Sequence, residues 1–359
     1  MKRCFQPFSA SILSVAMGVL PLVSLVSLVT YADRSLAGDL NRQLAIPLNS
    51  GTLSQARKGG DRWMMAGDRQ QQQGQMEAAI ESWQKALELY RRVVDQEAQG
   101  LVYRRLTKAY LELGRSIEAE DAARRALGFA RTLNDYQNQI LGYNEVGLLL
   151  MKRDPAEAER SFAEGVRIAT VLKDTPGLGT SLSNWGLAAK ATGQYATAIE
   201  RLQKGLPYQR IALDFAGESR SYQGLGDSFF ALGEYQKAAG HYISALVLAR
   251  QSKQHQVAFQ SLEGLAMAYD RLGANNAAME ALLDRVRLAG RTLEPAQVVE
   301  ALQTIAEYYY QKKDWAMTDR VYEQAIQIAE ANQLDKDVPQ LRKSLENLRN
   351  EFYFRRVRQ

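Results

Sequence analysis

The sequence is poor in the residues that most catalytic and metal sites need. It contains one cysteine, Cys4, and only two histidines, His241 and His255. A single cysteine excludes an internal disulfide and a metal site built from several cysteines. Phosphate-binding loops ending in Gly-Lys-Ser/Thr, His-Glu-x-x-His zinc motifs and Gly-x-Ser-x-Gly nucleophile elbows are also missing from the sequence. We therefore expect a protein that is not an enzyme and that uses no metal or cofactor.

Proline and net charge are also low. The 359 residues include 8 prolines, and 45 Lys and Arg face 40 Asp and Glu, which gives a net charge of +5 at pH 7. Nucleic-acid binding would need a clustered basic face with aromatic partners, and such a mild charge gives no support for it. Few prolines and 46% hydrophobic residues are typical of a folded protein with uninterrupted helices.

The chain has one long apolar run, from Ser11 to Thr30, preceded by the basic start Met1-Lys2-Arg3. This order directs the following chain out of the cytoplasm. Small residues suited to signal peptidase follow at Thr30-Tyr31-Ala32, but the run is also long enough to span a bilayer uncleaved. Residues 1–32 are thus predicted to be a signal peptide or an N-terminal membrane anchor. The rest would lie in a bacterial periplasm, in a thylakoid lumen or on a membrane surface.

Residues 33–59 are polar and lack sustained periodicity. They contain Pro47 and Gly51 and end at the pair Gly59-Gly60. Such a composition is typical of a flexible linker, and we predict one over 33–59.

The remainder of the chain repeats one pattern at a spacing of 40 residues. In residues 217–246, two apolar faces with helical periodicity are separated by Gly233, which predicts a helical hairpin. A small residue in the first helix recurs as Gly67, Thr107, Gly147, Gly186, Gly226, Ala266 and Ala306. An alanine in the second helix recurs as Ala79, Ala119, Ala158, Ala198, Ala238 and Ala278, with Thr318 in the last copy. One hairpin cannot bury both of its faces, so the copies are expected to stack.

Several residues of this unit carry a resemblance to the tetratricopeptide-repeat (TPR) family, namely Leu225, Gly226, Phe229, Gly233, Tyr235, Ala238, Tyr242 and Ala245. The 40-residue period resembles the class found in kinesin light chain and Pins proteins. The resemblance implies an all-α, right-handed superhelical solenoid of about seven hairpins over residues 60–334, whose first helices line a concave groove. Gln70 and Arg285 depart from the family pattern at an aromatic and a small position, so we expect looser packing in the first and sixth hairpins.

A last amphipathic segment, 335–359, follows the hairpins. Val338, Leu341, Leu345 and Leu348 define one apolar stripe, and the end of the segment is basic. A helix with one polar side would cover the open end of the array, so we predict a capping helix with a basic tail.

Side chains expected in the groove form the candidate partner site. Arg104, Arg105 and Lys108 lie within about one helical turn, which is suited to an acidic segment, although a solvated polar face is the alternative. Asn184 matches an Asn that grips peptide backbone in the resembling class. Further along, the groove positions are acidic: Asp227, Glu263, Asp270 and Glu307. A groove that changes sign would orient an extended partner.

These features predict a protein-interaction scaffold or assembly factor that binds an extended protein or peptide segment, without nucleic acid. Biogenesis of a membrane or envelope complex, photosynthetic complexes included, is the expected context by analogy with bacterial TPR factors. The alternatives are a peptide-sensing TPR regulator and a permanent accessory subunit of an enzyme complex.

Overall fold

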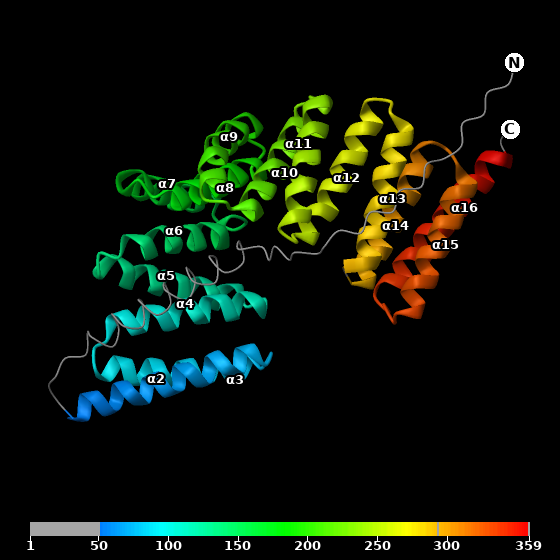
Figure 1. Cartoon of the computed structure of the whole chain (residues 1–359). Helices are drawn as coiled ribbons and strands as arrows, with labels where there is room; N and C mark the ends of the chain where they lie inside the picture. Colours follow the sequence, from blue (N-terminus) through cyan, green and yellow to red (C-terminus); the bar gives the residue numbers. More distant parts are fainter. Residues whose placement is uncertain (1–50, 293, 358–359) are drawn as a thin grey trace, which may run out of the picture. The chain divides into compact units, whose positions relative to one another are not determined.

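The computed structural model describes residues 51–292 and 294–357, and these form 15 helices without any strand (Figure 1). The predicted segment 1–32 lies outside the described residues, as does residue range 33–50 of the predicted linker. The helices are α2 (Gly51–Gln72), α3 (Met76–Arg92), α4 (Gln96–Glu112), α5 (Ser116–Thr132), α6 (Tyr136–Leu150), α7 (Pro155–Leu172), α8 (Thr175–Ala191), α9 (Tyr195–Ile211), α10 (Phe215–Ala231), α11 (Tyr235–Gln251), α12 (His255–Arg271), α13 (Asn275–Thr292), α14 (Pro295–Gln311), α15 (Trp315–Ala331) and α16 (Asp337–Val357).

From α2 to α15 the helices pair into the seven predicted hairpins, each even-numbered helix being followed by its odd-numbered partner. Neighbouring helices pack along the chain, and Figure 1 shows the hairpins following one another. First helices of successive hairpins also contact each other, as α6 does with α8, α8 with α10 and α10 with α12. Buried side chains of adjacent hairpins therefore belong to the same apolar clusters, as expected of a stacked array.

The recurring small residues lie where the two helices of a hairpin approach most closely. A methyl group added to Gly226 would lie 2.6 Å from the ring of Tyr242, which is inside any normal contact distance. The same relation links Gly67 with Trp83 and Gly147 with Phe162, both at 2.5 Å. The large side chain of the second helix thus occupies the space that the small residue leaves free.

The described helical region starts earlier than the sequence indicates, because α2 begins at Gly51 within the predicted linker 33–59. Gly59 and Gly60, interpreted above as the end of the linker, are in helix and pack against α3. Added methyl groups there would lie 3.2 Å from Leu89 and 2.7 Å from Tyr90. These two glycines allow close helix packing and belong to the first hairpin, whereas the sequence suggested the end of a linker there.

Helix α16 covers α15 as the predicted cap. Its side chains Leu341, Leu345 and Leu348 are buried against the end of the array. Among residues 51–292 and 294–357, no helix combines the length and the apolar character that crossing a membrane requires.

Two kinds of turn connect the helices. Within hairpins the left-handed residue is glycine at five turns, namely Gly74, Gly114, Gly193, Gly233 and Gly273. Between hairpins it is a residue with a side chain, and at two turns it is Val94 (φ 56°) and Leu213 (φ 55°). Left-handed backbone is disfavoured for bulky residues and most of all for β-branched ones, whereas asparagine tolerates it.

We expect Val94→Asn to raise the free energy of unfolding by about 1 kcal/mol, because Asn adopts the left-handed conformation at lower cost. Urea unfolding followed by circular dichroism would measure the change. The reverse substitution at the equivalent turn, Asn134→Val, serves as the matched control and is expected to lower stability by a similar amount. Equal stabilities of all three proteins would show that these turns carry no backbone strain.

Candidate functional site

The candidate site is the inner wall, which we define as the side chains of the first helices α2, α4, α6, α8, α10, α12 and α14 that lie on the side where these helices meet. Its polar residues are joined between neighbouring hairpins. Arg105 pairs with Asp68 at 3.1 Å, Lys190 with Asp227 at 2.6 Å and Lys312 with Asp270 at 2.5 Å. Each pair connects successive first helices, so the wall is held together by its own charges.

The aromatic filler residues fix two of these acids. Trp83 donates its indole N–H to Asp68 at 3.1 Å, and Tyr242 donates its hydroxyl to Asp227 at 2.9 Å. Burial raises the pKa of Tyr242, so its hydroxyl keeps the proton that it donates. One side chain therefore fills the hairpin and also orients the carboxylate on its inner wall.

The three residues of the predicted basic seat differ in their surroundings. Arg105 forms the ion pair with Asp68 described above. Arg104 has no hydrogen bond or ion pair with the described residues, although it is close enough to affect Glu145. Lys108 is 69% exposed and lies 3.9 Å from Glu112 on its own helix. Two cations of the seat, Arg104 and Lys108, thus remain open to a partner.

Most of the predicted acidic residues have a cationic partner. Asp227 and Asp270 are paired with lysines, and Glu263 contacts Arg285. Glu307 is exposed and carries no ion pair within the described part of the chain. The bases that compensate these acids were not singled out from the sequence. For Lys190 the available signal was its separation of 37 residues from Asp227, which is also the separation of Asp68 and Arg105.

Asn184 takes part in a polar contact between two hairpins. It donates its side-chain N–H to the Asn144 oxygen at 2.9 Å, and Asn144 in turn donates to Ser181 at 2.7 Å. Asn144 is buried, whereas Asn184 is partly exposed. The Asn184 carbonyl oxygen faces no donor of the described chain, so this side chain still has capacity for a partner.

A buried arginine stands behind the acidic part of the wall. Arg285 is fully buried, at a position where the other hairpins have Ala86, Ala126, Gly165, Gly205, Ala245 and Ala325. Its guanidinium group donates to Thr304 at 2.6 Å, to Glu263 at 2.9 Å and to Glu300 at 2.6 Å. It also lies 3.9 Å from the centre of the Phe259 ring.

Looser packing was expected in the first and sixth hairpins because of Gln70 and Arg285. For the sixth hairpin this expectation is wrong, because Arg285 is enclosed by α12, α13 and α14. Gln70 in the first hairpin is likewise accommodated, since it accepts a hydrogen bond from Ser82 at 2.7 Å. Polar side chains replace apolar packing at both positions by finding hydrogen-bond partners.

Two glutamates of the wall have raised pKa values and are therefore weaker acids than usual. Burial raises the pKa of Glu263, and the neighbouring Arg285 offsets part of that rise. Burial also raises the pKa of Glu145, with an opposing effect from Arg104. One Glu145 oxygen, Oε2, is buried without a hydrogen bond in the described chain.

Among the described residues, no three His, Cys, Asp or Glu side chains gather as a metal ion would need.

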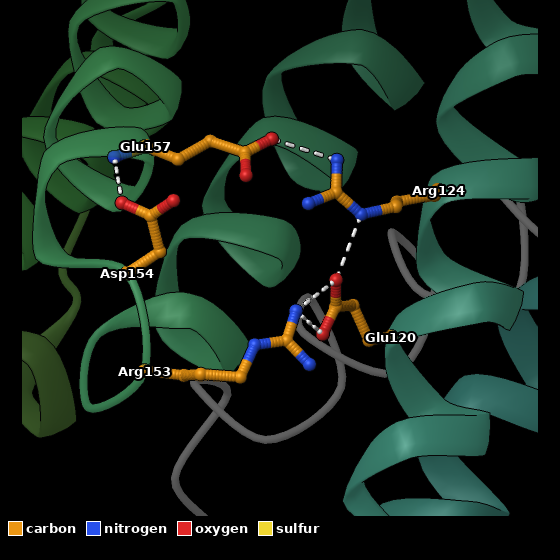
Figure 2. Close-up of polar contacts among 5 residues, drawn as sticks. All are labelled: Glu120, Arg124, Arg153, Asp154 and Glu157. Atoms are coloured by element: carbon orange, nitrogen blue, oxygen red, sulfur yellow. Dashed lines mark hydrogen bonds and ion pairs between the residues drawn. The ribbon is translucent and has the colours of Figure 1, made fainter.

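The outer helices are joined by a separate network (Figure 2). Arg124 of α5 donates to Glu120 at 2.9 Å and to Glu157 of α7 at 2.8 Å, and Arg153 pairs with Glu120 at 2.5 Å. Asp154 accepts from the backbone N–H of Glu157 at 2.9 Å and thereby caps the start of α7, whose first residue is Pro155. Both arginines are exposed, Arg124 at 41% and Arg153 at 61%, so the network contributes little to stability.

Residues 63–132, which lie in the first two hairpins, match the family model of the tetratricopeptide repeat. The chain has the tetratricopeptide-repeat (TPR) fold. The all-α superhelical solenoid expected from the sequence is thereby confirmed, and the period and the matched positions already indicated it.

Solved structures with the TPR fold cover most of this chain at low identity. A signal transduction ATPase with numerous domains from Pyrococcus horikoshii, which carries a tetratricopeptide repeat sensor, matches 82% of this chain at 20% identity with a TM-score of 0.61. The chain covers 45% of that ATPase, less than half its length.

Two other TPR structures match almost over their full length. A Rap protein in complex with Competence and Sporulation Factor matches 84% of this chain and 99% of its own at 10% identity, with a TM-score of 0.52. PilW, a type IV pilus biogenesis factor, matches 68% and 98% at 17% identity, with a TM-score of 0.50. No protein of curated function matches the sequence. At such identities these similarities establish the fold alone.

Arg285→Ala is expected to lower the stability of the sixth TPR hairpin by about 3 kcal/mol, because it leaves the partly buried Glu263 carboxylate without its counter-charge. Amide hydrogen exchange in α12–α14 would report the loss locally. Adding Glu263→Gln should recover part of the protection, since a neutral amide is less costly to bury.

Glu300→Gln in the same background is the matched control. Its side chain is 54% exposed, so its charge is already solvated and little protection should return. Unchanged exchange in the Arg285→Ala protein would show that the arginine does not hold this hairpin together.

Proposed function

We propose that this TPR solenoid is a non-enzymatic scaffold that holds an extended segment of a partner protein along its inner wall. The observation that carries the proposal is the uneven compensation of charge on that wall. Asp227, Asp270 and Glu263 are paired within the chain, whereas on α4 Arg104 forms no ion pair with the described residues and has only Glu145 in its vicinity, and Lys108 has only the 3.9 Å contact with Glu112 of its own helix. An acidic residue of the partner fits that place.

Apolar side chains continue the wall beyond the two cations. Leu148 of α6 is 47% exposed and Met267 of α12 is 44% exposed. Between them lies Asn184, which can accept a hydrogen bond from a partner's backbone. The proposed partner segment is therefore acidic next to α4 and followed by residues with apolar side chains that contact α6 and α12. Affinity would come from the apolar contacts, and orientation from the charges.

The proposed context is the biogenesis of a membrane or envelope complex, with the chain exported or anchored through residues 1–32. Two proteins of the same fold fit this class, since PilW is a pilus biogenesis factor and a Rap protein binds Competence and Sporulation Factor. The Rap complex also fits the alternative, a peptide-sensing regulator, which would release its partner when a free peptide occupies the wall. A permanent accessory subunit would instead stay bound in fixed stoichiometry.

The test is a charge reversal that leaves the inter-hairpin pairs intact, Arg104→Glu together with Lys108→Glu. We expect partner affinity to fall about tenfold, because two attractive contacts become repulsive. Partners recovered with the full chain from solubilised membranes would be quantified by mass spectrometry, and the affinity measured with the purified partner. Arg105 is left unchanged because it pairs with Asp68.

Lys204→Glu is the control. This lysine is exposed on the second helix α9, so its substitution reverses a charge away from the inner wall. Equal recovery with the double reversal and with the control, at equal thermal stability, would contradict the proposed basic seat.

A further inference from the structure

Four successive turns between hairpins expose large aliphatic side chains. At residues 93–95, 132–134, 171–173 and 211–213 these side chains protrude at the edge opposite the glycine turns. Val94, Val171, Ile211 and Leu213 are 70%, 73%, 72% and 69% exposed, and Leu133 and Leu172 are less exposed, at 42% and 40%. We call these four segments the aliphatic turns.

The fold does not require aliphatic residues there. The left-handed position of the turn is occupied by Asn134 and Lys173 in two of the aliphatic turns, and by Lys253 and Gln333 in later turns of the array. A polar residue is thus compatible with the same backbone. Val94 and Leu213 are unfavourable at this position both because of the backbone and because they expose apolar surface to water.

The charge around the aliphatic turns is basic toward the solvent. Exposed cations lie beside them, namely Arg92 and Arg131 at the ends of the preceding helices, Lys173 in its turn, and Arg210, which also pairs with the buried Glu218 at 2.7 Å. The nearby acids Asp95, Asp135 and Asp214 instead accept hydrogen bonds from backbone N–H groups at the start of the next helix. Three of the four carboxylates that follow these turns are thus compensated by the helix ends, Asp174 being the exception, and Arg92, Arg131 and Lys173 carry no ion pair within the described chain.

We propose that the aliphatic turns dock on an anionic membrane surface. Single aliphatic side chains at protruding turns can insert between lipid headgroups, while the cations beside them contact the phosphates. The side chains are separated by one hairpin each and form no groove, so the arrangement suits a lipid surface better than a folded protein partner. Docking at this edge leaves the inner wall free for a protein partner.

The experiment places an environment-sensitive dye on the full chain through Val171→Cys, in a Cys4→Ser background. We expect its emission to shift to shorter wavelength with vesicles of phosphatidylcholine and phosphatidylglycerol, and not with phosphatidylcholine alone. The matched reporter at a later polar turn, Lys253→Cys, should show no shift with either vesicle. Comparing lipids and positions within one chain keeps the result independent of how residues 1–32 behave.

A second arm adds Val94→Asn and Leu213→Asn to the Val171→Cys reporter. The apparent affinity for the anionic vesicles should fall about tenfold, because two inserted side chains are lost. The thermal midpoint should not fall, which separates this effect from loss of structure. The proposal is overturned by a missing shift at Val171→Cys, by an equal shift on neutral vesicles, or by a shift that needs no vesicles and grows with protein concentration.

Discussion

The structure depends on one close contact that is repeated along the chain. In four hairpins a glycine of the first helix faces a larger side chain of the second helix, as Gly67 faces Trp83, Gly147 faces Phe162, Gly186 faces Leu202 and Gly226 faces Tyr242. This contact sets the distance between the two helices and therefore the shape that each hairpin offers to the next. Because no hairpin can bury both of its faces alone, the array is stable only as a stack.

The same contact links packing with the surface chemistry of the inner wall. Trp83 and Tyr242 fill their hairpins and direct their polar atoms to Asp68 and Asp227. A cation from a neighbouring hairpin then completes each pair. Most charges on the wall consequently stabilise the stack, and the few that do not, such as Arg104 and Lys108, are the better candidates for recognition.

The hairpins could be predicted from the sequence because each packing position recurs in every copy. At each of the two small positions a glycine or alanine recurs in six of the seven copies, so the same steric requirement is visible repeatedly, which a single-copy feature cannot provide. The pairs between hairpins were missed because they join different positions of neighbouring copies, such as Lys190 and Asp227, and a comparison of equivalent positions does not show them.

Single exceptions to the repeat were the hardest to interpret. Arg285 departs from a small-residue position, and the sequence does not reveal that Glu263, Glu300 and Thr304 surround its guanidinium group. The pair Gly59-Gly60 suggested the end of a linker because glycine is common in linkers, but here it allows α2 to approach α3. In both cases the deciding partner lies on another helix.

The most direct test of this account compares two glycine-to-alanine substitutions in the fifth hairpin. Gly226 faces Tyr242, whereas a methyl group on Gly240 of α11 would meet nothing within 4 Å. Urea unfolding should show that Gly226→Ala lowers stability by about 2 kcal/mol through overpacking and that Gly240→Ala raises it by about 1 kcal/mol through helix propensity. If Gly226→Ala stabilised the protein as Gly240→Ala does, the close helix contact would not be what organises the fold.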